Sequence, residues 1–360
     1  MIFQSTGEDA YFAASNSAKG FHSDYKACFD IDRLEHLYAV KGGPGTGKSR
    51  FMRDVALWGR GLGWSCEYIY CSSDPDSLDG VILKQGERSL ALLDATAPHV
   101  WEPSRPGFRE DIVNLGVFWD TDALERDAET IEALNRQKSL AYRRAYRYLA
   151  CMGEMMESRD ALVSPYIRYD AVAAFAEKLM HGIAPEKGYV AVPANIRSVG
   201  MRGEVAFDTY FANAERICVI EDCRGSAQYL MRELGRIASE RGLSVRISHD
   251  PVCPDRLDGI FLTGTRTAFA VCQSELCTYP HRRVSMRRFV ETSKMKDVRR
   301  ELNFAARMQK AMLGAAIDAL AEVREVHFAI EKLYMAAMNF DAKETFTKIF
   351  CRELFGLQNN

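Results

Sequence analysis

The apolar residues of this chain form short runs that alternate with amphipathic segments. The run 37–40 (LYAV) has the length and composition of a buried strand, and apolar residues at 51, 52, 55 and 56 follow it at helical spacing. Two later runs, 64–70 and the one that ends at Asp94, predict two more strands. This alternation predicts an α/β fold whose mostly parallel sheet is covered by helices on both faces.

The same order of elements recurs in the second half of the chain. In chain order the matched segments are 19–21 with 187–189, 72–83 with 251–262, 98–99 with 280–281, and 169–180 with 340–351. Matches that keep a constant order indicate a tandem duplication. We therefore predict two domains, 1–180 and 181–360, that meet near residue 181.

Each half becomes largely helical after its third strand. Apolar residues recur near helical spacing within 122–162, and 285–339 is the matching part of the second half. We expect an αα-hairpin appended to each sheet. The basic and aromatic stretch YRRAYRYL (142–149) could contact phosphate or nucleic acid, but a helix with packed tyrosines and solvated arginines is the favoured interpretation.

Composition and charge narrow the class of protein. The chain has 360 residues, of which 47% are hydrophobic and 27% charged, and its formal net charge is −2, so nothing indicates nucleic-acid binding. No apolar run is long enough to span a membrane, and the N-terminus lacks the pattern of a signal peptide. The ten cysteines include no Cys-x-x-Cys pair, and no Cys/His cluster has the spacing of a zinc site, so buried thiols are favoured over disulfides or a metal site. We expect a cytoplasmic protein with reduced thiols.

Residues 42–49 (GGPGTGKS) form a complete G-x-x-x-x-G-K-[ST] motif between a predicted strand and a predicted helix. Its glycines let successive backbone N–H groups approach phosphate oxygens, and the N-terminus of the following helix favours the same anion. Lys48 is expected to reach the β- and γ-phosphates of ATP, and Ser49 to ligate Mg²⁺. The predicted nucleotide-binding residues are Gly42, Gly43, Pro44, Gly45, Thr46, Gly47, Lys48, Ser49 and Arg50.

A second metal-binding group is expected at the end of a later strand. Leu90 to Asp94 (LALLD) is a hydrophobic run that ends in aspartate, the pattern of a Walker-B element, so we predict that Asp94 and Ser49 hold Mg²⁺. Asp94 is not followed by the glutamate that orients water in many motor-type ATPases. The general base must come from elsewhere, or hydrolysis is slow.

The second half lacks the residues that would bind nucleotide. Its counterpart of the motif, 221–229 (EDCRGSAQY), has no lysine and no hydroxyl in the places of Lys48 and Ser49. Glu221 and Asp222 would repel phosphate, and the residue matched to Asp94 is Gln273. We predict a degenerate second domain without a nucleotide site.

The duplication also distinguishes acidic residues after the second strand that recur in the second half from those that do not. Asp76 and Asp79 recur as Asp255 and Asp258, so we interpret them mainly as turn-formers. Asp74 does not recur, which makes it the candidate for a catalytic carboxylate that orients water or faces a substrate. His99 recurs as His281 and is therefore interpreted as structural rather than catalytic.

The segments VKGGPGTGKS, CSSDPDSLDG and ALLDATAPH together resemble a family of uncharacterised bacterial tandem P-loop ATPases. The resemblance covers nearly the whole chain and rests on Gly42 to Ser49, Cys71 to Gly80, and Leu92 to His99. It implies two tandem P-loop NTPase-like domains and ATP binding. Members of that family often keep a recognisable P-loop in the second half, and this chain departs from them there.

These observations lead to one main hypothesis and two alternatives. The first is a slow Mg²⁺-dependent ATPase in which Lys48, Asp94 and Asp74 act, while the second half regulates or binds a protein partner, or mediates self-association. The alternatives are a P-loop kinase of a nucleoside, nucleotide or other small acceptor, with Asp74 engaging the acceptor, and a non-catalytic ATP-dependent switch. We expect an arginine finger to come from Arg88, Arg105 or Arg109, or from across a domain or subunit boundary.

Overall fold

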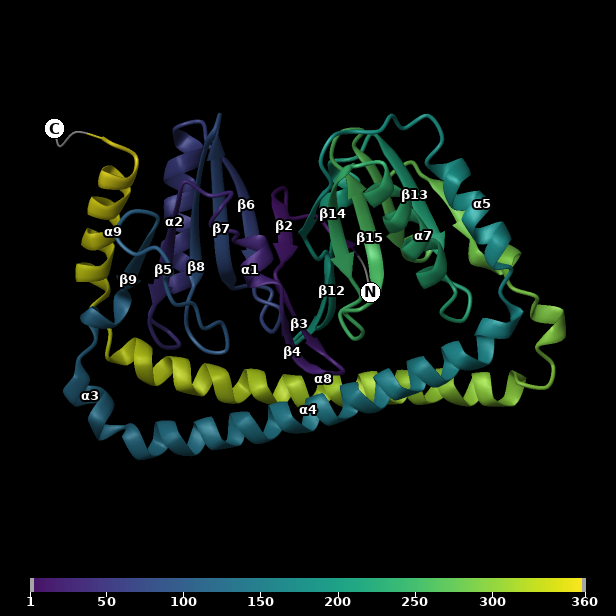
Figure 1. The fold of residues 1–360 in the computed structure, drawn as a ribbon. Helices are drawn as coiled ribbons and strands as arrows, with labels where there is room; N and C mark the ends of the chain where they lie inside the picture. Colours follow the sequence, from purple (N-terminus) through teal and green to yellow (C-terminus); the bar gives the residue numbers. More distant parts are fainter. Residues whose placement is uncertain (1–2, 358–360) are drawn as a thin grey trace.

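A computed structural model describes residues 3–357 as two α/β units joined by two long helices (Figure 1). The first unit contains a six-stranded sheet in the order β2-β6-β7-β8-β5-β9. Its strands are β2 (Asp9–Phe12), β5 (His36–Lys41), β6 (Ser65–Tyr70), β7 (Leu78–Gln85), β8 (Arg88–Asp94) and β9 (Glu110–Asn114). Its short and surface elements are the hairpin β3 (Ala14–Ser17) and β4 (Gly20–Ser23), α1 (Tyr25–Cys28), α2 (Lys48–Gly61), η1 (Leu115–Phe118) and α3 (Thr121–Arg126).

The second unit repeats this plan with a sheet in the order β10-β14-β15-β16-β13-β17. Its strands are β10 (Val190–Pro193), β13 (Arg216–Glu221), β14 (Ser244–His249), β15 (Leu257–Leu262), β16 (Thr267–Val271) and β17 (Arg282–Ser285). Its other elements are the hairpin β11 (Arg197–Gly200) and β12 (Gly203–Phe207), α6 (Thr209–Ala212), α7 (Ala227–Glu240), η3 (Ser274–Leu276), η4 (Met286–Phe289) and η5 (Thr292–Lys294).

The two sheets match strand for strand. In each sheet the strand before the loop pairs in parallel with both of its neighbours, as β5 does with β8 and β9, and as β13 does with β16 and β17. A register shift between Ile69 and Tyr70 in the first sheet recurs between Ser248 and His249 in the second. The α/β class is therefore confirmed. Each sheet is mixed rather than all parallel, because β7 and β15 run antiparallel to both neighbours.

Helices cover the outer face of each sheet, and the inner faces share one core. The strands are buried on both sides: in β5, Leu37 and Ala39 belong to the core between the sheets, whereas Val40 packs with α2. The shared core draws residues from both halves, including Phe29, Tyr210 and Phe211. We predicted helices on both faces of each sheet; the inner faces carry the short helices α1 and α6, but they are covered mainly by the other unit.

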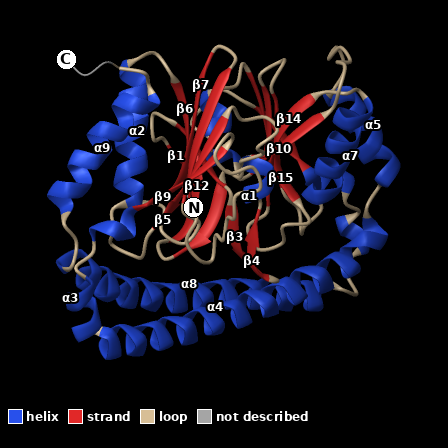
Figure 2. Ribbon diagram, turned by 60° about the vertical axis from the view of Figure 1, so that its left-hand side comes forward, coloured by secondary structure: helices blue, strands red, loops and turns tan. Residues whose placement is uncertain are grey.

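The two halves exchange their C-terminal helices. α4 (Ala128–Val163) and α8 (Arg299–Ala336) run side by side below both sheets, and each carries its chain to the other unit (Figures 1 and 2). As a result α5 (Tyr169–Leu179) packs on α7, and α9 (Phe340–Leu354) packs on α2. The predicted helical hairpin on each sheet is therefore wrong: each half contributes one long helix to a pair that spans the molecule.

Further contacts join the halves near the centre of the molecule. β1 (Phe3–Gln4) pairs with β12, and Phe12 forms a bridge with Asn195. Arg246 of β14 forms an ion pair with Glu67 of β6 at 2.6 Å, with side chains 20% and 14% exposed. Burial alone would raise the pKa of Glu67, but Arg246 and then Lys84 outweigh it and lower that pKa to about 2. This nearly buried ion pair therefore links the two sheets.

Strand register corrects three of the matches made from the sequence. Ala95 donates to the carbonyl of Val40 as Cys272 does to that of Ile220, so the counterpart of Asp94 is Val271 and not Gln273. Because the β7–β8 hairpin is longer than the β15–β16 hairpin, the comparison of sequences matched Asp94 with the wrong residue. Likewise Arg282 pairs with Cys218 as Asp111 pairs with Tyr38, which aligns His281 with Glu110 instead of His99.

The third correction concerns the segment 19–21. Lys19 and Gly20 lie in the turn of the β3–β4 hairpin, whose counterpart is the β11–β12 turn with Arg202 and Gly203. Residues 187–189 instead precede β10.

Two sequence expectations concern the chain as a whole. No helix within residues 3–357 is both long enough and apolar enough to cross a membrane. All ten cysteines are free, and five of them are buried. The chain therefore folds without disulfides.

Candidate functional site

The glycine-rich loop, residues 42–49, joins the end of β5 to the start of α2. Gly45 and Gly47 have φ angles of 70° and 78°, a backbone conformation that L side chains rarely adopt. Gly47 is the N-cap of α2, and no side chain caps that helix end. The positive N-terminal end of α2 therefore points its backbone donors at the loop.

Lys48 and Asp94 are brought together at this loop. The Lys48 Nζ donates hydrogen bonds to the carbonyls of Gly42 and Gly43 at 2.8 and 2.9 Å, and lies 3.5 Å from Asp94 Oδ2. Burial raises the pKa of Asp94 above its ordinary value, and the charge of Lys48 only partly opposes this. Thr96 holds Asp94 and the loop in place. Its backbone N–H donates to Asp94 Oδ1, and its hydroxyl donates to the Gly42 carbonyl, each at 2.8 Å.

The other loop residues have separate roles. Thr46 is fully buried, and its hydroxyl donates to the Gly43 carbonyl at 2.9 Å, which braces the loop. The Ser49 hydroxyl accepts a hydrogen bond from the backbone N–H of Leu78 at 2.9 Å, tying α2 to the start of β7. Arg50 points away from the loop, because its side chain is 74% exposed and pairs with Asp54. The predicted contact of Arg50 with nucleotide stays a prediction.

The C-terminal end of α8 lies directly on the loop. A Cβ added at Gly45 would approach the Glu331 carbonyl to 2.7 Å, and one added at Gly43 would come within 3.1 Å of Tyr334 and 3.2 Å of Trp119. Glycine at positions 43 and 45 therefore permits the close approach of a helix from the other half of the chain. Nothing in the local sequence around the loop signals this cover.

Glu331 places a carboxylate against the loop. A hydrogen bond from His327, whose Nε2 lies 3.5 Å away, lowers the pKa of Glu331, and the Gly45 backbone N–H and the charge of Lys48 lower it further. The Glu331 carboxylate therefore lies near the loop and Lys48 while it pairs with His327. Sequence reasoning missed Glu331 because it stands far along the chain in an unremarkable helical segment.

Asp74 lies in the turn between β6 and β7, beside the same part of α8. Burial raises the pKa of Asp74, although Arg202, His327 and Arg324 favour its charged form and Glu331 opposes it. Asp76 is exposed and forms an ion pair with Arg202. Asp79 is not a turn-former as expected, because it is buried within β7.

The three arginines considered as arginine fingers lie at the opposite edge of the sheet. Arg88 begins β8 and pairs with Glu35, whereas Asp94 ends the same strand beside the loop. Arg105 pairs with Asp32, and Arg109 donates to the carbonyls of Ile31 and Leu34. The positions near Asp74 are held instead by Arg202 and Arg324, both from beyond residue 180.

In the second loop, residues 222–226, a carboxylate of the loop itself accepts hydrogen bonds from the backbone amides. Asp222 accepts hydrogen bonds from the backbone N–H groups of Gly225 at 2.6 Å and Ala227 at 2.8 Å. Glu221 turns aside to pair with Arg283 at 2.7 Å. We predicted that both carboxylates would repel phosphate. In the structure Asp222 accepts hydrogen bonds from the backbone amides that a phosphate would need, and Glu221 pairs with Arg283 instead.

A helix from the other half covers the second loop as well. Asp160 of α4 accepts a hydrogen bond from Gln228 Nε2 and forms an ion pair with Arg256, both at 2.7 Å. Asp160 and Glu331 are equivalent, because each precedes the matching bridge residue, Ile167 or Met338, by the same interval. Both loops therefore carry an acidic residue from the opposite half.

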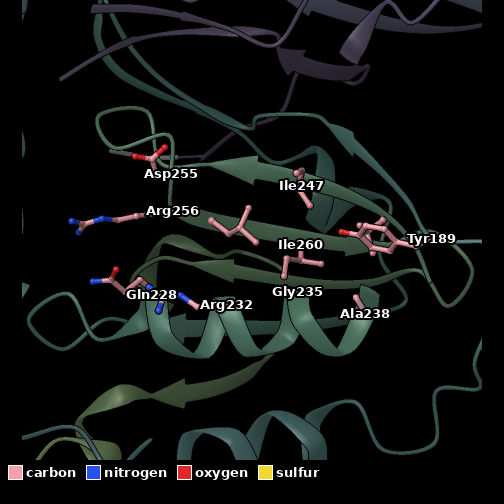
Figure 3. Close-up of a pocket in the computed structure, with 11 residues that line it drawn as sticks. Tyr189, Gln228, Arg232, Gly235, Ala238, Ile247, Asp255, Arg256 and Ile260 are labelled. Atoms are coloured by element: carbon pink, nitrogen blue, oxygen red, sulfur yellow. The ribbon is translucent and has the colours of Figure 1, made fainter. Parts of the chain in front are cut away.

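A cavity of about 240 Å³ lies beside the second loop, between α7 and the strands β14 and β15 (Figure 3). Its floor is apolar, with Ile247 and Ile260, and Gln228, Arg232 and Arg256 gather at one end. Arg232 corresponds to Arg53, which in the first unit approaches Glu8 to 3.9 Å.

Comparison with known proteins identifies no family for this chain: no family model, no curated protein and no solved structure matches it. The resemblance to tandem P-loop ATPases therefore stays a prediction.

Proposed function

We propose that residues 42–49 are a P-loop and that the first unit binds Mg²⁺–ATP and hydrolyses it slowly. The observation that carries this proposal is the joint placement of Lys48 and Asp94, 3.5 Å apart at the N-terminus of α2, with the lysine held on the loop carbonyls. A cation, a carboxylate and a helix N-terminus at the end of adjacent parallel strands are what a phosphate–magnesium site requires.

The residues present fit both parts of the ligand. Glycines with positive φ would let the backbone amides of the loop turn toward phosphate oxygens, and the Glu331 carboxylate lies near the Gly45 amide. The Ser49 hydroxyl and the Asp94 carboxylate are the oxygen ligands that Mg²⁺ prefers. When bound, the metal ion would neutralise charge on the phosphates. Lys48 would contact the terminal phosphates, and Asp94 would hold the metal once Lys48 turns from the loop carbonyls toward the ligand.

The cover by α8 supports slow turnover. Because Glu331 faces the Gly45 amide and Lys48, a phosphate must displace this carboxylate before it can take the same donors. Displacement would also shift α8 against the loop and, through the α4–α8 pair, reach the second unit. This gives the degenerate second unit a regulatory role.

A P-loop kinase is the second candidate. Arg202 and Arg324 lie near Asp74, at the side of the loop that α8 covers, and such cations would suit a phosphorylated or otherwise anionic acceptor. Asp74 would then engage the acceptor hydroxyl.

One assay separates the candidates. The full chain with Mg²⁺ and ATP is tested for phosphate release alone and then with a panel of nucleosides and nucleoside monophosphates. Phosphate release that is independent of any acceptor supports the ATPase. ADP formation that requires an acceptor supports the kinase and overturns hydrolysis as the main activity. Tight binding without turnover of either kind supports a switch.

A further inference from the structure

Buried polar atoms without hydrogen-bond partners gather near the ends of β6 and β8. Among residues 3–357 they include Tyr25 Oη, Asp79 Oδ2 and His99 Nδ1. The side chains of Asp79 and His99 are only 6% and 7% exposed, and His99 Nε2 lies 3.2 Å from Asp79 Oδ2 without the alignment of a hydrogen bond. Buried polar groups are nearly always satisfied, so this cluster requires an explanation.

The cluster contains three metal-binding side chains of different kinds. Cys71 follows β6, Asp79 lies at the start of β7, and His99 follows β8, so all three meet at one edge of the sheet. One ligand atom from each lies within 4.8 Å of the others. Sulfur, carboxylate oxygen and imidazole nitrogen are the donors that Zn²⁺ uses, and three protein ligands with a fourth position open is a common arrangement. Mg²⁺ and Ca²⁺, which prefer oxygen ligands, do not suit a thiolate.

The second unit places a guanidinium against its buried aspartate, where the first unit places the imidazole of His99. Asp258, the counterpart of Asp79, forms an ion pair with Arg197 at 3.0 Å and accepts a hydrogen bond from Ser248. Arg197 begins β11, and the residue that begins the matching strand β3 is Ala14. A buried carboxylate needs a compensating charge, and the second unit supplies it with arginine.

We propose that Cys71, Asp79 and His99 bind a thiophilic divalent transition metal ion, with Zn²⁺ as the natural occupant. The metal takes the place in the first unit that Arg197 takes in the second. Binding converts the Cys71 thiol to thiolate and releases its proton to solvent. The orphaned oxygen of Asp79 and one ring nitrogen of His99 gain a partner. This site is separate from the proposed Mg²⁺ ligands Ser49 and Asp94, and it does not depend on nucleotide binding.

The test uses the full chain and Co²⁺ as a spectroscopic probe. Wild-type protein, stripped with a chelator and titrated with Co²⁺, is expected to develop a sulfur-to-cobalt charge-transfer band at one Co²⁺ per chain, and Zn²⁺ should abolish the band. Absence of the band from the wild-type protein overturns the proposal and requires no variant.

Variants locate the ligand. Cys71→Ser should lose the band, and Asp79→Asn and His99→Gln should each raise the Co²⁺ dissociation constant by about 10- to 100-fold. Cys66→Ser is the matched control, since Cys66 lies on the same strand outside the cluster and should leave the band unchanged. A band that survives in Cys71→Ser, or is lost in Cys66→Ser, overturns the assignment. Lys48→Ala should keep the band, and its loss there would refute independence from the nucleotide site.

Discussion

The two loops stand at the same place in matching sheets but treat an anion differently. In the first loop Lys48 and Asp94 face each other and Glu331 approaches from α8. In the second loop Asp222 accepts from two loop amides, and Asp160 is held by Gln228 and Arg256. The amides of the second loop are therefore taken up by Asp222, whereas near the first loop the Glu331 carboxylate pairs with His327. On the proposed function, the second loop would bind no phosphate because a protein carboxylate takes the place of the ligand.

The largest expected effect comes from removing the lysine of the first loop. Lys48→Ala should weaken ATP binding roughly 100-fold, because a hydrogen-bonded charge contributes about 1.5–3 kcal/mol. Isothermal titration of the full chain with Mg²⁺–ATP measures this. Gln228→Ala removes only the contacts to Asp160 and Gly225 and is the matched control in the second loop. Equal losses in the two variants would contradict a single nucleotide site.

Asp94 should matter for turnover rather than for holding nucleotide. Asp94→Asn is expected to slow phosphate release about tenfold, because the amide is a poorer metal ligand and no longer pairs with Lys48. Val271→Ala, at the matching position of the second sheet, should change nothing. A rate equal to wild type in Asp94→Asn would remove this residue from the site.

The same carboxylate predicts a pH dependence. Burial raises the pKa of Asp94, and the metal needs its deprotonated form. As pH falls, Asp94 therefore takes up its proton at a higher pH than an exposed aspartate would, and Mg²⁺-dependent turnover should decline from that point. Asp94→Asn should abolish this acid limb of the pH–rate profile. Persistence of the limb would assign it to another group.

A smaller effect is expected from Glu331. Glu331→Gln removes a negative charge that competes for the first loop, so ATP should bind about fivefold tighter, since an anion near a helix N-terminus contributes about 1 kcal/mol. Asp160→Asn is the control, because its loop has no lysine to offer. Unchanged affinity in Glu331→Gln, with a large loss of turnover, would instead make Glu331 a catalytic group.

The smallest effect concerns the filled loop itself. Asp222→Ala frees two amides, so the protein should lose about 1 kcal/mol of stability through the missing cap, while gaining no affinity for ATP. Chemical denaturation measures the first quantity and titration the second. A new nucleotide site in this variant would show that the carboxylate alone had closed the second loop.

The local pattern of the chain predicted much of this fold. Residues 37–40 and 217–220 lie within β5 and β13, and the helices after them are α2 and α7. The strand β7 was missed, because SLDG resembles a turn, although Asp79 and Gly80 are buried in the sheet.

The arrangement of the long helices could not be predicted in this way. Helical periodicity indicates which face of α4 is apolar, but not that its partner is α8. The strand register could not be predicted from the sequence either. Because the two hairpins differ in length, the sequence comparison matched Asp94 with Gln273, whereas strand pairing shows that its counterpart is Val271. In the site, Lys48 and Asp94 followed from motifs with fixed spacing, whereas Glu331 arrives through the exchange of helices and leaves no local signal.

The ion pair between Glu67 and Arg246 has a consequence for the origin of the chain. Counted from the recurring register shifts in β6 and β14, these two residues occupy equivalent positions, so each faces its own counterpart. In an isologous homodimer a residue on the two-fold axis meets an identical copy of itself, and two glutamates or two arginines there would repel. Two non-identical halves, such as those of this chain, can place opposite charges at that point. The divergence of the two halves thus permits an attraction that exact two-fold symmetry forbids.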